Sequence, residues 1–120
     1  MRKNRKTNEN TAALIFELKR VSRGSEAQIW RDIAKRLEKP RRLWPEVNLS
    51  KIERYVQEGE TVLVPGKVLA AGRISRPVTV AGISASKAAR EKLVQAGGRW
   101  ITIAELIKEN PKGKDIRIMA

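Results

Sequence analysis

Apolar residues in the first half of the chain recur at helical intervals. Leu14, Leu18 and Val21 are separated by four and then three residues, which gives a helix from Asn10 onward one apolar side. The helix is expected to end at Gly24, because glycine is common just beyond helix ends and the basic residues before it suit a last turn. The pattern therefore predicts a first helix over residues 10–24.

A second helix is predicted directly after the first. Ser25 is a candidate N-cap residue, and Gln28, three positions later, would complete a capping box. The helix should end at Pro40, since proline cannot continue the backbone hydrogen bonds. Its apolar side is formed by residues at four-residue spacing and their neighbours, namely Ile29, Ile33 and Leu37 with Trp30 and Ala34.

The next segment is irregular and then helical. Residues 39–46 contain two prolines and predict an ordered loop or an extended segment. A short helix is expected from Asn48, with Val47 and Ile52 placed as a hydrophobic staple, and it should end at Gly59. The first half of the chain is thus predicted to be mainly helical.

Short β-type runs alternate with helices in the second half. Strands are predicted at 61–64, 78–80, 100–102 and 115–119, and the first of them should stop at Pro65-Gly66. These strands and the helices between them indicate an α/β fold, in which a helical N-terminal half precedes short strands that alternate with helices. An all-helical fold is the alternative.

Capping residues set the ends of the two helices in this half. Ser84 or Ser86 is expected to cap a helix that runs through Ala96 and closes at Gly97-Gly98. Thr102 and Glu105 form a capping box that opens a last helix, which should end before Pro111.

Composition limits both size and chemistry. The 120 residues, 41% of them hydrophobic, are enough for one modest core, so we expect a single domain at 10–120. Residues 1–9 lack apolar side chains after Met1 and are predicted to be a flexible basic arm. The longest apolar run has five residues, 12–16, and no signal-peptide pattern follows the basic N-terminus, which predicts a soluble intracellular protein.

Catalysis is not expected. The chain has no His and no Cys, which removes thiolate or imidazole metal sites, disulfides and imidazole-based triads. Ser84-Ala-Ser-Lys87 matches a Ser-x-x-Lys pattern, but its companion motifs are missing and a capped helix explains it. Gly66-Lys67 resembles the end of a phosphate-binding loop but lacks the earlier glycine and the following Ser or Thr. The prediction is no enzyme, no cofactor, no metal and no small-molecule substrate.

The charge indicates a polyanionic partner. There are 26 Lys and Arg against 13 Asp and Glu, a formal net charge of +13. An anionic membrane would require a helix with a basic side and a bulky apolar side, and none is predicted. Nucleic acid is therefore the favoured partner.

Candidate contacts fall into three acid-poor groups. The stretch 61–90 contains no acidic residue at all, whereas residues 46–60 carry four Glu and resemble ordinary solvated surface. Several separate basic groups suggest an extended nucleic-acid surface with many phosphate contacts. The candidates are Arg2, Lys3, Arg5 and Lys6 in the arm; Lys35, Arg36, Lys39, Arg41 and Arg42; and Lys67, Arg73, Arg76, Lys87 and Arg90.

Three further residues are candidates for a different reason. Gly66 and Gly72 would let the backbone approach a phosphate where a Cβ atom would interfere. Trp44, between Arg42 and Pro45, could stack on an exposed base, and the alternative is that it packs the loop onto the core.

The residues leave more than one kind of nucleic acid open as the partner. The helix pair at 12–38 resembles a helix-turn-helix, and a free DNA-binding or regulatory module is the alternative function. However, its second helix opens with Glu26 and Ala27, which are poor readers of base edges.

Several motifs resemble one ribosomal protein family. Lys67–Ile74, Val78–Val80 and Ala85–Ala89, with Leu93 and Gly97, resemble the signature shared by bacterial large-subunit protein fifteen and archaeal/eukaryotic large-subunit protein eighteen. Four further segments resemble the archaeal/eukaryotic branch specifically: Ile29–Asp32 through Lys39–Arg42, Glu46–Asn48, Val64–Lys67 and Asn110–Gly113.

The resemblance implies a fold and a role. It implies a small α/β fold, an irregular superhelix of strand–strand–helix turns, and a structural role in the cytoplasmic ribosome without catalysis. Large-subunit rRNA and neighbouring large-subunit proteins are the implied partners. The 61–90 stretch is then predicted to be the principal rRNA-facing surface.

Overall fold

The computed structural model describes residues 2–25 and 27–120, with side chains from Thr11 onward apart from residue 26. The helices are α1 (Arg2–Ser25), α2 (Gln28–Leu37), α3 (Leu49–Tyr55), α4 (Lys87–Gln95) and α5 (Ile103–Glu109), with a 3-10 turn, η1, at Arg41–Leu43. The strands are β1 (Glu46–Asn48), β2 (Thr61–Leu69), β3 (Thr79–Ala85), β4 (Arg99–Thr102) and β5 (Ile116–Ile118). The predicted α/β class is confirmed.

The strands form one parallel sheet around β2. The order is β1-β2-β3-β4, and β5 also pairs with β2. β5 pairs with the first residues of β2, where Thr61 lies opposite Ile116, and β1 pairs with the last, where Lys67 lies opposite Glu46. β2 therefore links the N-terminal half of the chain to its C-terminal strand.

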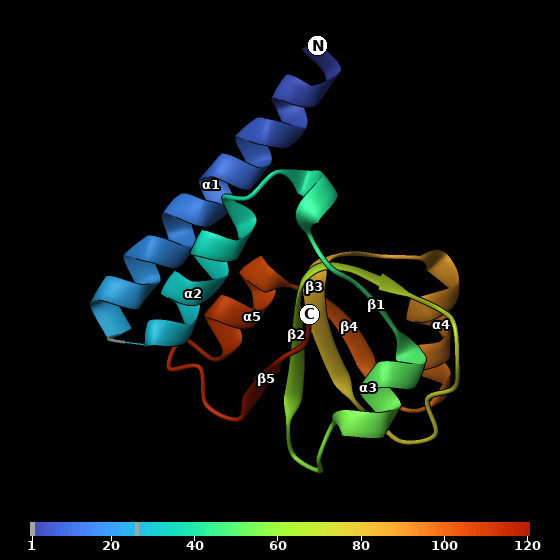
Figure 1. The fold of residues 1–120 in the computed structure, drawn as a ribbon. Coiled ribbons are helices and arrows are strands. Elements are labelled where there is room, and N and C mark those ends of the chain that lie inside the picture. Colours follow the sequence, from blue (N-terminus) through green and yellow to red (C-terminus); the bar gives the residue numbers. More distant parts are fainter. Residues whose placement is uncertain (1, 26) are drawn as a thin grey trace.

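Helices cover both faces of the sheet (Figure 1), so its strands are apolar on both sides. On one face α3 and α4 pack on Val62, Val64 and Val80. On the other, α1, α2 and α5 pack on Leu63, Ala81 and Ile101. Successive strand residues thus alternate between two cores, as the pleat requires.

α1 and α2 lie side by side and run antiparallel (Figure 1), and not at the wide angle typical of a helix-turn-helix. α1 begins at Arg2 and not at Asn10, because residues 2–9 contain neither Gly nor Pro to interrupt a helix. That residues 1–9 form a flexible arm stays a prediction.

The predicted cap at Ser25 is wrong. Ser25 is the last residue of α1, and its hydroxyl donates to the Val21 carbonyl oxygen at 2.7 Å. α2 instead begins after Ala27, which makes no side-chain cap hydrogen bond. The apolar side of α2 is confirmed, with Trp30 and Ile33 fully buried.

β2 does not stop at Pro65-Gly66 as predicted. The strand continues to Leu69, and its register with β3 shifts between Val64 and Lys67. Proline is tolerated at such a bulge because no ladder hydrogen bond is needed from its nitrogen. A strand was not predicted at Glu46–Asn48, where β1 forms between the predicted loop or extended segment and the helix that follows. That helix, α3, ends at Tyr55, before Gly59.

The caps of the C-terminal helices are confirmed. Ser86 Oγ accepts from the Ala89 N–H at 3.1 Å at the start of α4. Thr102 and Glu105 form the reciprocal capping box of α5. Trp30 Nε1 donates to the Pro111 carbonyl oxygen at 2.6 Å, which fixes the loop after α5 against α2.

Candidate nucleic-acid interface

The Arg41-Arg42 turn is held in place by Trp44. Trp44 Nε1 donates to the Lys39 carbonyl oxygen at 3.0 Å, and the ring packs on the core formed by α1, α2 and α5. The Arg41 guanidinium lies over the ring, 5.5 Å from its centroid, in a cation–π contact. The structure therefore gives Trp44 the packing role that was the alternative to base stacking.

Two of the predicted basic groups meet at a shallow hollow, which we call the Arg–Lys hollow. The Lys67 N–H donates to the Pro45 carbonyl oxygen at 3.0 Å, so the bulge of β2 lies against the segment that follows η1. The hollow of about 300 Å³ is lined by Arg41, Arg42, Trp44, Pro45, Glu46, Gly66, Lys67, Ile83 and Ser84. Three cations from distant parts of the sequence thus share one site with a single carboxylate.

Gly66 and Gly72 are required by contacts within the chain. A Cβ atom on Gly66 would lie 2.1 Å from the Pro45 carbonyl oxygen. Gly72 has φ +101°, and a Cβ there would lie 2.5 Å from Ser50 Cβ. Close approaches within the chain account for glycine at both positions, and a phosphate contact at either stays a prediction.

Arg76 has a structural role that the sequence did not indicate. Its Nη2 donates to the carbonyl oxygens of Glu53 at 2.9 Å and Val56 at 2.8 Å, at the C-terminal end of α3. These carbonyls have no partner within the helix, and a cation at this end also suits the helix dipole. Arg76 was predicted only as a phosphate contact, and the structure shows that its guanidinium is also bound within the fold.

Glu53 also connects α3 to the loop that carries Arg76. It accepts from the Ser75 hydroxyl at 2.5 Å and from the Ser75 N–H at 3.3 Å, and lies 3.7 Å from Arg76 Nε. The hydrogen bonds from Ser75 and the nearby Arg76 charge hold the pKa of Glu53 below its usual value. The loop 70–78 between β2 and β3 is therefore fastened to α3.

A second fastening comes from Lys92 on α4. Lys92 Nζ donates to the carbonyl oxygens of Ala70 at 2.8 Å and Gly72 at 3.0 Å. Arg73 remains exposed at the tip of this loop and, among the described residues, has no ion-pair partner. Lys87 and Arg90 are exposed on α4, where they line another hollow together with Glu91, Val94 and Gln95.

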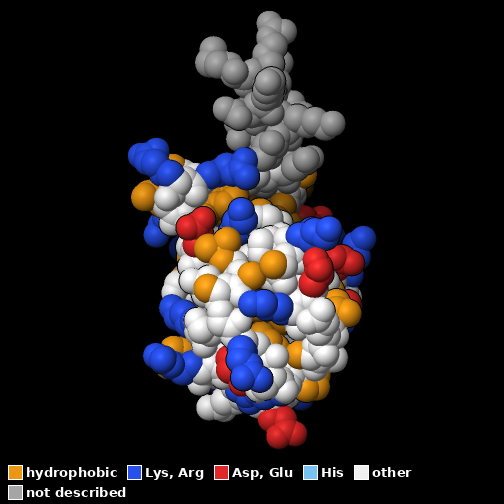
Figure 2. Space-filling model, turned by 90° about the vertical axis from the view of Figure 1, so that its right-hand side faces the viewer, with side chains coloured by type: hydrophobic (Ala, Val, Ile, Leu, Met, Phe, Trp, Pro, Cys, Tyr) orange, Lys and Arg blue, Asp and Glu red, His pale blue; other side chains and the backbone are white. Residues whose placement is uncertain are grey.

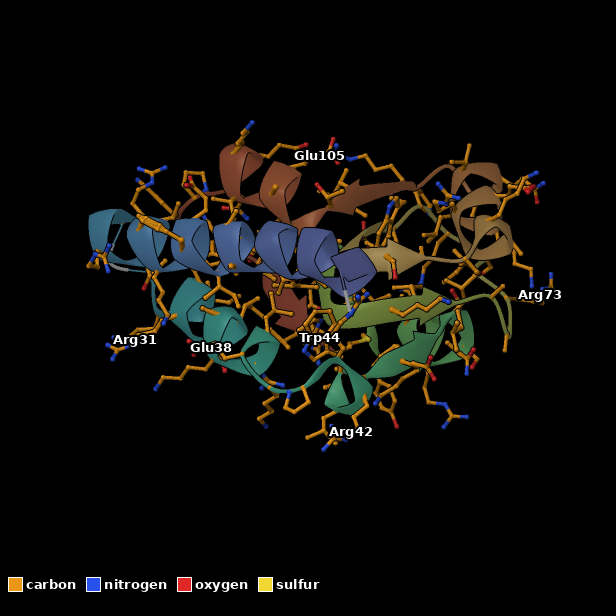
Figure 3. All side chains as sticks on the ribbon, turned by 90° about the horizontal axis from the view of Figure 1, so that it is seen from above. Arg31, Glu38, Arg42, Trp44, Arg73 and Glu105 are labelled. Carbon is orange, nitrogen blue, oxygen red and sulfur yellow. The ribbon has the colours of Figure 1, made fainter. Side chains whose placement is uncertain are left out.

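The cations of the 61–90 stretch do not form one patch. Lys67 belongs to the Arg–Lys hollow, Arg76 is used inside the fold, and Arg73 projects at one end of the molecule (Figure 3). Figure 2 shows Lys and Arg in several separate groups on the face toward α4, with acidic side chains between some of them.

The remaining predicted residues lie on or next to α2. Lys35 and Lys39 are exposed, and Arg36 Nε pairs with Asp32 Oδ1 at 3.1 Å on the same helix. Lys35 lines a groove between α1 and α2 together with Lys19, Arg23 and Arg31, three cations that were not predicted as contacts. Helical spacing could have indicated Arg31, which precedes Lys35 by four residues.

The side chains of Arg2, Lys3, Arg5 and Lys6 lie outside the described residues. In the part that is described, no group of three or more acidic side chains could hold a metal ion. Within the same residues, no helix is long and apolar enough to cross a membrane.

The sequence is similar to a known family over its whole length. The model for "Ribosomal protein 60S L18 and 50S L18e" matches residues 1–120. Large ribosomal subunit protein eL18 of Methanospirillum hungatei is 52% identical over 118 residues, 98% of each chain. The protein of the same name from Archaeoglobus fulgidus is 51% identical over 115 residues, 96% of this chain and 98% of the relative. That from Methanococcus maripaludis is 50% identical over 120 residues, the full length of both.

The α/β fold, the dispersed cations and these similarities define a structural ribosomal protein, not an enzyme. The chain belongs to the family of large-subunit ribosomal proteins 60S L18 and 50S L18e. The resemblance drawn from the sequence motifs to the archaeal/eukaryotic branch is confirmed.

Proposed function

We propose that this constituent of the large ribosomal subunit binds large-subunit rRNA at several separate basic sites and thereby bridges RNA segments. The observation that carries the proposal is the Arg–Lys hollow, where Arg41, Arg42 and Lys67 come together from two parts of the chain. Arg offers paired donors to a phosphate and Lys a point charge, so the hollow suits a bent RNA backbone.

Bridging follows from the separation of the cationic sites. Arg42 lies on one side of the molecule in the view of Figure 3, and Arg73 projects from its far end. An RNA strand bound at Arg42 and another bound at Arg73 would be held at a fixed distance from each other. The reason is that the loop 70–78 is fastened to α3 and α4 by Arg76 and Lys92. Cations between RNA segments also offset the repulsion of their phosphates.

The other predicted residues are proposed to contribute to RNA binding in different ways. Lys87 and Arg90 are proposed to extend the site around Arg73, because they are exposed on α4 and the hollow that they line shares Gln95 with the one that Arg73 lines. The arm cations Arg2, Lys3, Arg5 and Lys6 are proposed to contribute phosphate contacts on binding. Neighbouring large-subunit proteins are the expected protein partners in the cytoplasmic ribosome.

The first test is the salt dependence of binding. The affinity of the protein for deproteinised large-subunit rRNA should fall steeply with salt, with a log–log slope of about −0.7 to −0.9 per phosphate contact. Filter binding between low and moderate salt measures the slope. An affinity that hardly changes with salt would contradict the polyanion proposal.

The second test compares single charge reversals. Lys67→Glu should weaken rRNA binding by about 5- to 10-fold at 0.1 M salt and make the salt slope shallower by roughly one contact. Arg54→Glu is the matched control, because Arg54 is also exposed and lies in the Glu-rich segment. If both variants lose affinity equally, the protein uses its charge only in bulk and the hollow is not a site.

The DNA-binding alternative makes a different prediction. A free DNA-binding module should not remain with large subunits on a sucrose gradient, whereas a ribosomal constituent should. The antiparallel packing of α1 on α2 also removes the geometry on which that alternative depended.

A further inference from the structure

α1 and α2 enclose a groove with a basic lining, which we call the α1–α2 groove. It has a volume of about 730 Å³ and is lined by Lys19, Ser22, Arg23, Gln28, Arg31, Lys35 and Glu38. Among the residues that the structure describes, the lining therefore holds four cations and one carboxylate. Of these residues, the sequence had indicated only Lys35 as a contact.

Glu38 is the residue that reduces the charge of the groove. Its Oε2 pairs with Lys19 Nζ at 2.9 Å, and both side chains are nearly half exposed, at 47% and 43%. Among the described residues, Arg23, Arg31 and Lys35 have no ion-pair partner. These three cations are thus available for an anionic ligand.

A second hollow lies beside the same exposed part of α2, toward β5. It has a volume of about 590 Å³ and is lined by Gln28, Ile29, Arg31, Asp32, Lys35 and Ile118. Gln28, Arg31 and Lys35 line both hollows, and their spacing of three and four residues places them in one row along the helix. They form a ridge with a hollow on each side.

The ridge is held rigidly. The opposite side of α2 is buried through Trp30, Ile33 and Leu37, and Trp30 is also hydrogen-bonded to the loop after α5. In the view of Figure 3, Arg31 and Glu38 lie on the same side of the molecule as Arg42, and Glu105 lies on the opposite side. The ridge and the Arg–Lys hollow therefore share one side of the protein.

The chemistry of the lining favours a duplex over a single strand. Neither lining, as the described residues define it, contains an aromatic side chain on which an unpaired base could stack. An RNA duplex presents a wide, shallow minor groove bordered by two phosphate backbones and displaying 2′-hydroxyl groups. A cationic ridge between two hollows is complementary to that shape and charge.

We infer that the Gln28–Arg31–Lys35 ridge of α2 binds double-stranded RNA across its minor groove, with one phosphate backbone in each flanking hollow. Arg31 and Lys35 neutralise phosphates, and the Gln28 amide is placed to hydrogen-bond a 2′-hydroxyl. The inference rests on the proposed function and specifies the kind of rRNA element that this face takes.

The experiment measures binding of the full chain to two probes by fluorescence anisotropy. One probe is a mixed-sequence RNA duplex of about 16 base pairs, comparable to the span of a double-stranded-RNA-binding domain, and the other is a single strand of equal length. At 0.1 M salt, Arg31→Glu and Lys35→Glu should each weaken duplex binding about 5- to 10-fold relative to Arg54→Glu. All three positions are exposed, so the reversals should leave the fold intact. Circular dichroism and thermal melting are used to check that each variant folds.

A gain of affinity provides a second readout. Glu38→Gln removes the one carboxylate that lines the α1–α2 groove within the described residues and releases Lys19, so duplex binding should tighten about 5-fold. Glu58→Gln removes the same charge from an exposed position in the Glu-rich segment and should change duplex binding much less.

The outcomes separate this inference from the proposed function. If the unmodified chain binds deproteinised large-subunit rRNA but Arg31→Glu loses no more affinity than Arg54→Glu, the ridge assignment is overturned and the proposed function stands. Tighter binding of the single strand than of the duplex overturns the assignment in the same way. If the unmodified chain fails to bind large-subunit rRNA at all, the proposed function itself fails.

Discussion

Arg76 closes the C-terminal end of α3, where its Nη2 donates to the carbonyl oxygen of Val56 at 2.8 Å. The same nitrogen also bonds the Glu53 carbonyl oxygen, so one guanidinium satisfies two carbonyls that the helix leaves free. This contact fastens the loop between β2 and β3 to α3.

The first prediction concerns the stability that this contact provides. Arg76→Ala should lower the free energy of unfolding by about 2 kcal/mol, because two charge-assisted hydrogen bonds are lost. Urea denaturation followed by circular dichroism measures the change. Arg73→Ala, three residues earlier on an exposed tip, should change the free energy by less than about 0.5 kcal/mol. Equal losses at both positions would refute the structural role of Arg76.

Arg76 also shows where sequence reasoning reaches its limit. The carbonyls that it binds are 20 and 23 residues away in the chain, so no local pattern links them. The acid-free stretch predicted that Arg76 contacts RNA, and only the packing of the loop on α3 shows that its guanidinium binds carbonyls at the end of that helix. The same applies to Lys92, whose partners are the carbonyls of Ala70 and Gly72.

Features set by local interactions were predicted well. The caps at Ser86 and Thr102 bond to N–H groups three residues ahead, and the strands at 100–102 and 115–119 follow simple apolar patterns. Ser25 failed as a cap because its hydroxyl bonds backward to Val21 in α1. For the candidate site, charge runs indicated Arg41, Arg42 and Lys67, but only the pairing of β1 with β2 brings them together.

The second prediction contrasts two glycines. Gly66→Ala should destabilise the protein by about 1–3 kcal/mol, because the added Cβ would lie 2.1 Å from the Pro45 carbonyl oxygen and force the backbone to move. Gly24→Ala is the control, since no atom lies within 4 Å of its added Cβ and the residue is in α1. Its thermal midpoint should stay the same or rise slightly, as alanine favours the helix. A stable Gly66→Ala protein would show that this approach is not required.

The third prediction concerns pH. The Arg117 side chain and the Gln57 N–H lower the pKa of Glu60, and the Ser75 hydrogen bonds lower the pKa of Glu53. A carboxyl whose pKa is lower in the folded state adds stability above its unfolded pKa of about 4.3, and that stability is lost as the pH falls through the folded pKa. The free energy of unfolding should therefore be nearly constant from pH 7 to pH 5.5 and fall below about pH 4.5.

A substitution identifies the groups responsible. Glu53→Gln should reduce stability at pH 7 and make the loss below pH 4.5 smaller, because one of the contributing carboxyls is gone. Glu58→Gln is the matched control, since Glu58 is exposed and makes no hydrogen bond within the described part of the chain. Chemical denaturation at each pH measures both effects, and identical pH profiles for all three proteins would contradict the assignment.

The last prediction separates binding from stability at the N-terminus. Residues 1–9 carry four cations and no apolar side chain after Met1, so they offer little to bury even though the backbone of α1 begins at Arg2. Deleting them should leave the thermal midpoint of the free protein nearly unchanged. The same deletion should weaken rRNA binding and make the salt slope shallower by as much as four phosphate contacts, about 3 log units per log unit of salt. Replacing Arg2, Lys3, Arg5 and Lys6 by Gln in the full-length chain is the control, because it keeps the length and removes only the charge. A large fall in the thermal midpoint on deletion, with little change in the Gln variant, would mean that the segment packs on the fold and is not a flexible arm.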